Sequence, residues 1–247
     1  MHDYQPPEDL LNGRKILVTG AGSGIGRAIS KVLAQYGATV ILLGRTIAKL
    51  ESVYDEIEAA GWAQPAIYPL NLEGATEHDY REMAETLDKE FGVLDGLLHN
   101  AAQVKLLSRV DDYDVETWMK VMQVNLNGPF IMTQACMPLL RKAKDASVVF
   151  TSDTVGRKAK AYWGAYAASK FGVEGLMQVL AEETRDSSNI RVNSFDPGPT
   201  RTNLRANAYP GEDPDANKSP EALAGHYLWL MGPASIGTTG QALSYSE

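Results

Sequence analysis

The sequence predicts an α/β fold in which a single domain contains a doubly wound parallel sheet with helices on both faces. Two observations support this prediction. Apolar runs of strand character alternate with segments of helical period, and a glycine-rich turn joins the first strand to the first helix. Parallel strands need crossover connections, and the crossing helices cover both faces of the sheet. A chain of 247 residues, 44% of them hydrophobic, is long enough to bury one sizeable core.

The elements follow one another in a regular order. An apolar run at 15–19 predicts a strand, apolar residues spaced three and four apart from Ile25 to Tyr36 predict a helix, and the run at 39–43 predicts a second strand. The further elements that we expect are a helix around 47–57, a strand at 66–70, a helix at about 76–91, a strand at 94–99, a long helix at about 115–141, a strand at 147–151, a helix at 162–185 and a strand at 190–195.

One stretch interrupts this alternation. Residues 203–219 are rich in Pro, Asn, Asp and Gly and show no period, and they precede a helix expected near 221–231. Long segments without regular structure in a compact domain are often lids or binding loops. We therefore expect a substrate lid at about 203–219, within one domain that spans 1–247.

Composition and charge exclude several classes of protein. Acidic residues outnumber basic ones by 31 to 23 and no block of Lys or Arg stands out, so we expect neither nucleic acid nor a membrane as a partner. A single cysteine, Cys136, and four scattered histidines offer neither a disulfide nor a zinc-ligand spacing, so no metal is expected. The first twelve residues lack the features of a signal peptide, and no apolar run approaches the roughly 18 residues of a membrane span, which predicts a cytoplasmic protein.

The turn after the first strand is suited to bind a pyrophosphate. Its backbone N–H groups and the positive end of the following helix would face an anion above the strand. The residues expected to contact the phosphates are Gly20, Ser23, Gly24, Ile25 and Gly26. The alternative is a glycine-rich turn that only packs, but the strand before it and the helix after it favour a dinucleotide site.

The end of the second strand indicates which dinucleotide is bound. In NAD-binding domains an acidic residue there holds the ribose 2′-hydroxyl, whereas here Leu43 is followed by Gly44 and Arg45. A guanidinium in place of a carboxylate favours the 2′-phosphate of NADP, so we expect NADP(H) rather than NAD(H). The alternative for Arg45 is a solvated residue in the first turn of the next helix.

Five motifs occur in a fixed order along the chain. They are Thr19-Gly20-x3-Gly24-Ile25-Gly26, His99-Asn100-Ala101-Ala102, Val124-Asn125-Leu126, Tyr166-x3-Lys170 and Pro197-Gly198. In this order and spacing they resemble the short-chain dehydrogenases/reductases, and the match covers almost the whole chain. The runs at 40–45 and 163–170 resemble the bacterial YciK-type branch more narrowly. The resemblance implies a Rossmann fold and an oxidoreductase, but it implies no particular substrate.

Tyr166 and Lys170 form the candidate proton-transfer pair. They are four residues apart on a predicted helix and therefore share a face. A nearby ammonium favours the phenolate and would lower the tyrosine pKa from its ordinary value near 10. Tyr166 is thus the candidate general acid/base for a small carbonyl or alcohol, as hydride moves to or from a nicotinamide. The alternative for such a pair is a surface pair without a catalytic role.

The family resemblance implies roles for further residues. Lys170 would also hold the nicotinamide ribose, and Asn125 would help to seat a water chain that resupplies the proton. The alternative for Asn125 is a hydrogen bond to the backbone of its own helix. The long helices that contain Asn125 and Tyr166 would pack against a second copy, giving a homodimer or homotetramer. The cofactor-binding residues expected beyond the glycine-rich turn are Arg45, Asn71, Asn100, Tyr166, Lys170, Pro197, Gly198 and Thr202.

Two residues depart from the family pattern. Ala102 stands where the family has a glycine, which adds a Cβ close to the expected ribose. Asp153 stands where the family has a serine that donates a hydrogen bond to the substrate oxygen. An ionised carboxylate only accepts hydrogen bonds, and it would repel the charge that develops on that oxygen.

The Asp153 substitution leaves several interpretations open. In the first interpretation Asp153 is protonated and donates the hydrogen bond, and in the second a hydroxyl of Ser152 or Thr154 donates it instead. In the third, carbonyl reduction is impaired. In the fourth, the carboxylate turns away from the site and bonds the backbone of the next turn. If reduction is lost, the chain would be a nucleotide-binding protein with little or no catalysis, acting as a sensor or scaffold. The intact set of Tyr166, Lys170 and Asn125 favours the enzyme.

Overall fold

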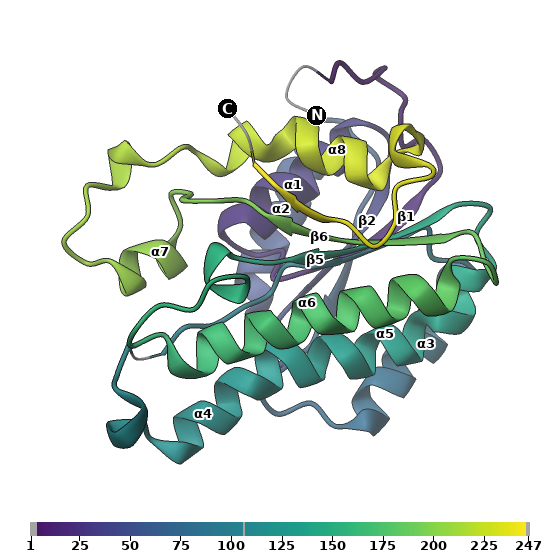
Figure 1. Cartoon of the computed structure of the whole chain (residues 1–247). Coiled ribbons are helices and arrows are strands. Elements are labelled where there is room, and N and C mark those ends of the chain that lie inside the picture. The colour runs from purple at the N-terminus through teal and green to yellow at the C-terminus, as the bar shows by residue number, and fades with distance from the viewer. Residues whose placement is uncertain (1–3, 106, 246–247) are drawn as a thin grey trace.

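The computed structural model describes residues 4–105 and 107–245, which contain a sheet of seven parallel strands in the order β3-β2-β1-β4-β5-β6-β7 (Figure 1). The strands are β1 (Lys15–Thr19), β2 (Thr39–Gly44), β3 (Ala66–Pro69), β4 (Gly96–His99), β5 (Ala146–Thr151), β6 (Ile190–Asp196) and β7 (Ala242–Ser244). The helices are α1 (Gly24–Gln35), α2 (Ile47–Ala59), α3 (Glu77–Phe91), α4 (Val115–Met122), α5 (Gly128–Arg141), α6 (Gly164–Thr184), α7 (Asn203–Ala208) and α8 (Ala224–Met231). The predicted doubly wound fold is confirmed.

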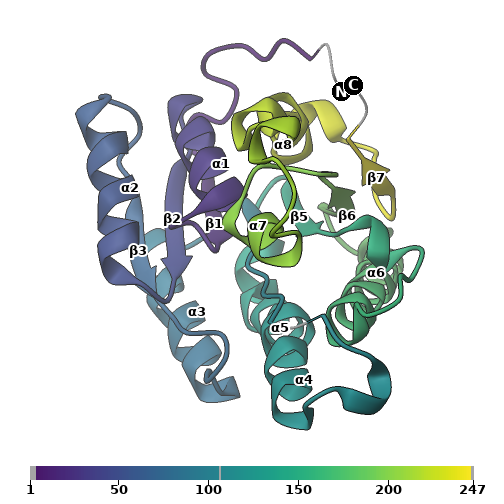
Figure 2. The same cartoon turned by 90° about the vertical axis from the view of Figure 1, so that its left-hand side faces the viewer.

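The sheet is buried on both faces because its strands are apolar at successive positions. Side chains alternate between the faces of a strand, so Ile16 and Val18 pack toward α1, α2 and α8, whereas Leu17 packs toward α3, α5 and α6. Figure 2 shows these two groups of helices on opposite sides of the sheet. The continuous apolar runs that predicted strands are therefore explained by two separate contact surfaces.

The strand order places a crevice above the middle of the sheet. Strand β1 pairs with β2 on one side and with β4 on the other, so the winding direction reverses between β1 and β4. Ligands of open parallel sheets bind outside the carboxyl ends of the strands at such a reversal. In Figure 2, α7 lies in front of these strand ends.

Three elements differ from the sequence-based expectation. The helix predicted at 115–141 is divided into α4 and α5 by a wider π-helical turn at Gln123–Asn127. Residues Asn203–Ala208 of the expected lid, which show no apolar period, form the short helix α7, with Thr202 capping its N-terminus. Strand β7 was not predicted, because three partly exposed residues at the edge of a sheet carry no periodic signal. Among the described residues no helix is long and apolar enough to cross a membrane.

Candidate active site

A cavity of about 590 Å³ opens at the carboxyl ends of the strands. Thirteen of the residues predicted to bind the cofactor or to act in catalysis line it: Gly20, Ser23, Gly24, Ile25, Arg45, Asn71, Asn100, Asp153, Tyr166, Lys170, Pro197, Gly198 and Thr202. The other two predicted site residues, Gly26 and Asn125, are buried and are not among the residues that line the described cavity. The sequence motifs thus converge on one place in the fold. Within the described residues no cluster of His, Cys, Asp or Glu is suited to hold a metal ion.

The glycine-rich turn is shaped by close backbone approaches. Gly20 and Gly24 have φ angles of +69° and +53°, which side chains rarely allow. A Cβ on Gly26 would lie 2.3 Å from the carbonyl oxygen of Gly20 and 2.6 Å from Nδ2 of Asn100. Gly26 is therefore a packing residue behind the turn, and Asn100 holds the turn by donating to the carbonyl of Thr19. This arrangement leaves the first N–H groups of α1 facing the cavity, as a phosphate site requires.

The segment beside the glycine-rich turn carries positive charge, and Lys49 lies close to Gly22. Arg45 is exposed directly after β2, and Lys49 follows one turn later on α2. Within 4–105 and 107–245, Arg45 forms no ion pair or hydrogen bond, so its guanidinium is available to an anion. Lys49 was missed in the sequence because no motif marks it.

Tyr166, Lys170 and Asp153 meet at the other end of the cavity. Tyr166 and Lys170 are both buried on α6, and Nζ of Lys170 lies 5.7 Å from the centroid of the Tyr166 ring. Lys170 donates to the carbonyl of Thr151 at 2.6 Å. Gly156 makes this possible, because a Cβ there would lie 2.7 Å from Cβ of Lys170. The predicted pairing of Tyr166 with Lys170 is present in the fold.

The Asp153 side chain accepts hydrogen bonds at both oxygens. One oxygen accepts from the backbone N–H of Val155 at 3.0 Å, and the other accepts from the Tyr166 hydroxyl at 3.1 Å. The expected bond to the next turn is therefore present, but Asp153 does not turn away from the site. It engages the hydroxyl that was predicted to act on the substrate.

The electrostatics of Tyr166 differ from the expectation. Burial and the neighbouring Asp153 carboxylate raise the pKa of Tyr166 well above its ordinary value. The prediction that Lys170 would lower this pKa is thus wrong for this structure, because desolvation and a like charge outweigh the ammonium. Burial lowers the pKa of Lys170 to about 8, although Asp153, Asp196 and Glu174 act in the opposite direction.

The neighbouring hydroxyls have other partners. Ser152 donates to Glu174, and Thr154 donates to Asp196 at 2.7 Å. Neither hydroxyl is free to take the role of the serine that the family has at position 153. The structure therefore argues against the interpretation that Ser152 or Thr154 donates to the substrate. Asp196 was missed in the sequence, although it directly precedes the Pro197-Gly198 motif and lines the cavity.

Asn125 holds the chain segment that follows β4. Its Oδ1 accepts from the backbone N–H of Gln103 at 2.8 Å, and its Nδ2 donates to the carbonyl of Gln103 and to Oγ of Ser169. These side-chain bonds run to a neighbouring loop and helix, so the alternative of a bond to its own helix backbone is not what the structure contains. The π-helical turn places Asn125 against both partners.

Comparison with known proteins agrees with this geometry. The family model for short chain dehydrogenases matches residues 14–213. The chain is 48% identical to the uncharacterized oxidoreductase YciK of Escherichia coli (strain K12) over 240 residues, which is 97% of this chain and 94% of that protein. The chain belongs to the short-chain dehydrogenase family. The predicted resemblance, including that to the YciK-type branch, is confirmed.

Solved structures of this family superpose closely. A Pseudomonas syringae structure described as a short chain dehydrogenase has a TM-score of 0.96 and 52% identity, with 98% of each chain covered. A short chain dehydrogenase from Escherichia coli CFT073, complexed with NADPH, has a TM-score of 0.93 and 48% identity, covering 97% of this chain and 99% of the other.

Behind the Tyr166–Lys170 pair of this short-chain dehydrogenase lies a buried carboxylate that the sequence did not reveal. Glu174 follows Lys170 by one turn of α6 and accepts hydrogen bonds from Ser152, Ser194 and Arg157. Arg157 also donates to Ser244 and to the carbonyl of Leu243, and it thereby joins β7 to the turn after β5. Glu174 thus fixes the segment that carries Asp153.

Replacing Glu174 by alanine is expected to reduce the free energy of unfolding by about 2–3 kcal/mol, because Arg157 and two serine hydroxyls lose a buried partner. Urea unfolding followed by circular dichroism measures the effect. Glu182→Ala is the matched control, because Glu182 is exposed on the same helix and pairs with Arg185 at the surface. Its change should stay within about 0.5 kcal/mol. Equal midpoints for both variants would contradict the prediction.

The expected lid is joined at its base. Thr200 and Lys218 form an isolated bridge, and the backbone N–H of Arg201 donates to the carbonyl of Lys218 at 2.9 Å. Lys218 also donates to the carbonyl of Pro199 and lies over the ring of Tyr245. The base of the segment is therefore tied to the sheet, while α7 lines the cavity.

Proposed function

We propose that the chain is an NADP(H)-dependent oxidoreductase that interconverts a small carbonyl compound and an alcohol by hydride transfer. The observation that carries this proposal is the convergence of three features on one cavity. The glycine-rich turn and Arg45 lie at one end, and the Tyr166–Lys170 pair lies at the other. A cavity of about 590 Å³ is within the usual size range of cofactor sites.

The residues present fit a phosphorylated dinucleotide. The absence of a Cβ at Gly26 allows the helix to start close against Gly20. The backbone N–H groups of the turn are then accessible to a pyrophosphate. Arg45 and Lys49 would receive the 2′-phosphate, and the NADPH in the Escherichia coli CFT073 relative supports this choice. Asn71, Asn100 and Thr202 would border the adenosine and pyrophosphate parts. When bound, the nicotinamide supplies or accepts the hydride.

The side chains of the site then handle the proton. The hydroxyl of Tyr166 donates to the oxygen of the carbonyl substrate, or accepts from the alcohol in the reverse direction. The ammonium of Lys170 stabilises the phenolate that forms when Tyr166 gives up its proton. Because the pKa of Tyr166 is raised, the hydroxyl holds its proton until the substrate oxygen becomes negative. Asn125 keeps the floor of the site in place through its bonds to Gln103 and Ser169.

A second function is favoured by one observation. The Tyr166 hydroxyl donates to Asp153 rather than being free for a substrate. If this bond persists when ligands bind, the chain binds nucleotide with little or no catalysis, as a sensor or scaffold. The same carboxylate would also repel a developing oxyanion.

Oxidation of NADPH in the presence of a broad panel of aldehydes and ketones separates the two functions. Turnover of any panel member, with loss of turnover in Tyr166→Phe, supports the oxidoreductase. Tight NADPH binding without turnover, in both the wild type and Asp153→Ser, would favour the binding protein.

Arg45→Ala is expected to weaken NADPH binding about tenfold and to leave NADH binding nearly unchanged. The reason is that an exposed guanidinium contributes one charge-assisted contact to the 2′-phosphate. Fluorescence titration with both cofactors measures the two dissociation constants. Arg81→Ala, on the outer face of α3, is the control and should alter neither constant. Tighter binding of NADH than of NADPH by the wild type would refute the cofactor assignment.

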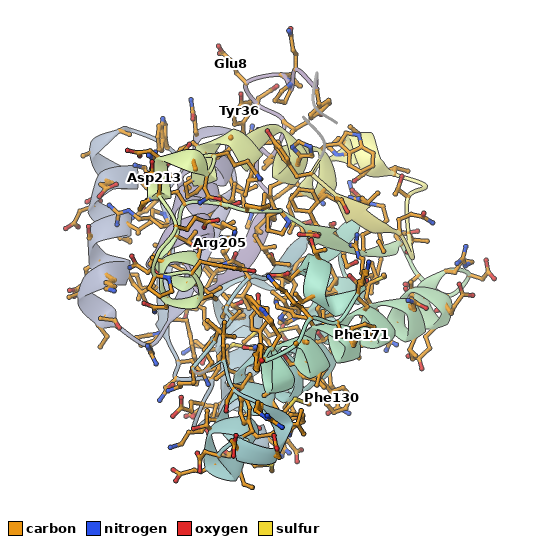
Figure 3. All side chains as sticks on the ribbon, turned by 60° about the vertical axis from the view of Figure 1, so that its left-hand side comes forward. Glu8, Tyr36, Phe130, Phe171, Arg205 and Asp213 are labelled. Carbon is orange, nitrogen blue, oxygen red and sulfur yellow. The ribbon has the colours of Figure 1, made fainter. Side chains whose placement is uncertain are left out.

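Further proposals concern the setting of the enzyme. Phe130 on α5 and Phe171 on α6 are 48% and 45% exposed, and both lie at the surface (Figure 3). Exposed aromatic rings on these helices support the proposed homodimer or homotetramer. A cytoplasmic location and a small-molecule substrate complete the proposal, with a lid at 203–219.

A further inference from the structure

The half of the cavity beside Tyr166 is built from aromatic and small apolar side chains. Trp163 packs against both Tyr166 and Tyr209, with ring centroids 5.5 Å and 5.6 Å away. Val155 and Ala208 pack with these rings in a cluster separate from the packing of the sheet. A substrate that enters this half places an apolar or aromatic body between the Tyr166 hydroxyl and the rim formed by Tyr209.

The two ends of this half differ in charge. Asp153 touches the Tyr166 hydroxyl, and Asp196 lies nearby on the next strand. An anionic group attached to the reacting carbon of a substrate would therefore lie against carboxylates. Only a group some distance from that carbon can be anionic without being repelled.

The rim at Tyr209 carries two cations from different segments. Nζ of Lys160 lies 5.1 Å from the centroid of the Tyr209 ring and donates to its hydroxyl, and Cζ of Arg205 lies 3.7 Å from the same centroid. Both side chains line the cavity. In Figure 3 the Arg205 side chain extends from α7 toward the body of the domain.

Arg205 is held in place by an ion pair, whereas the charge of Lys160 is unpaired in the described part of the chain. Glu212 accepts from Nε and Nη2 of Arg205 at 2.6 Å, so the guanidinium is fixed while its Nη1 has no acceptor among the described residues. Lys160 forms no ion pair within 4–105 and 107–245. The rim thus has two donors beside one ring, of which only Arg205 is ion-paired among the residues described, and the Asp153 carboxylate also acts electrostatically on Arg205. Such a pair is suited to a carboxylate.

We propose that the substrate carries a carboxylate at the end remote from its reacting carbonyl carbon, and that Lys160 and Arg205 bind this group. The inference rests on the proposed function for the position of the reacting carbon at Tyr166. The repulsion at Asp153 and the attraction at the rim then orient the substrate in one direction. Compounds such as 2-oxo acids, whose carboxylate adjoins the carbonyl, are excluded.

Matched probes test the proposal. They are 4-formylbenzoate and 4′-formylbiphenyl-4-carboxylate, whose one- and two-ring bodies suit the spacing of the three aromatic rings, together with their methyl esters. Phenylglyoxylate and its methyl ester place the carboxylate on the reacting carbon instead. The dissociation constant of each probe from the protein–NADP⁺ complex is measured by ligand-detected NMR, which does not require turnover. The kcat/KM of each probe is measured with NADPH.

At least one formyl carboxylate is expected to bind about tenfold more tightly than its ester, and phenylglyoxylate is expected to have no such advantage. Lys160→Gln with Arg205→Gln should remove the preference without weakening the esters. Lys158→Gln and Arg201→Gln are matched controls, because both residues lie nearby but outside the described cavity lining. Glu212→Gln should retain the preference, which separates the charge of Arg205 from the folding of the lid.

Equal binding of acid and ester by the wild type, a preference that survives the double variant, or no binding of any probe would overturn the proposal. Turnover without a preference would overturn it and leave the oxidoreductase function standing. A preference in binding without turnover of any carbonyl would support the carboxylate site and count against the oxidoreductase function.

Discussion

Asp153→Ser is expected to raise the rate of carbonyl reduction by one to three orders of magnitude. In the wild type the Tyr166 hydroxyl donates to Asp153, and a carboxylate about 4 Å from the developing oxyanion would cost on the order of 4 kcal/mol at an effective dielectric near 20. That figure is an upper range, and it corresponds to about a thousandfold in rate. A serine removes the charge, frees the Tyr166 hydroxyl and adds a neutral donor.

The measurement is kcat/KM with the best carbonyl of the panel, alongside the dissociation constant of NADPH, which should change little. A serine oxygen can still accept from the N–H of Val155, so the turn after β5 should be retained. Asp153→Asn is the companion variant, since it removes the charge but keeps the size. If Asp153 instead worked as a protonated donor, Asp153→Ser would be about as active as the wild type, and the interpretation of Asp153 as a repulsive acceptor would be wrong.

Tyr166→Phe is expected to lower turnover by about 10²- to 10⁴-fold, the usual contribution of a positioned acid or base. The hydroxyl is the only atom removed, and its described hydrogen-bond partner is Asp153, which keeps its bond to Val155. NADPH binding and the unfolding midpoint should therefore stay near those of the wild type. Tyr162→Phe is the matched control, because Tyr162 is 58% exposed and lies outside the described cavity lining. Equal turnover of Tyr166→Phe and the wild type would remove Tyr166 from the mechanism.

The kcat of the wild type is expected to depend on pH through Lys170. Burial lowers the pKa of Lys170 to about 8, so its ammonium is present below that pH and is lost as the pH rises through it. The phenol of Tyr166 stays protonated over this range because its pKa is raised. Wild-type kcat is therefore expected to fall above about pH 8, when the phenolate formed in the reaction loses its neighbouring charge.

Most of the fold could be predicted because its signals are local. Strand β1 has the predicted bounds, and β5 begins one residue before the predicted start, since buried parallel strands are continuous apolar runs between turns. The π-helical turn at Gln123–Asn127 could not be predicted, because the apolar spacing continues through it. Strand β7 is defined by its pairing with β6, which lies far away in the sequence.

The site divides in the same way. Residues that act through the backbone or in a spaced motif, such as Gly20 and Tyr166, could be found from the sequence. Glu174, Lys160 and Arg205 could not, because each gains its role from partners on other segments. The raised pKa of Tyr166 was also missed, since spacing indicates the proximity of Lys170 but does not indicate the degree of burial or the direction of Asp153.

The bridge between Thr200 and Lys218 has a consequence for how the substrate range of this protein can change. The two ends of the segment 201–217 are held side by side, so the segment is an exchangeable cassette: it can be replaced by another while its ends stay attached at the same place. The entropic cost of closing a loop grows slowly with its length. Segments of different length can therefore be accommodated between the same two ends. Exchange of this cassette between relatives should therefore transfer substrate choice, through Arg205 and Tyr209, while the sheet and the glycine-rich turn remain as they are.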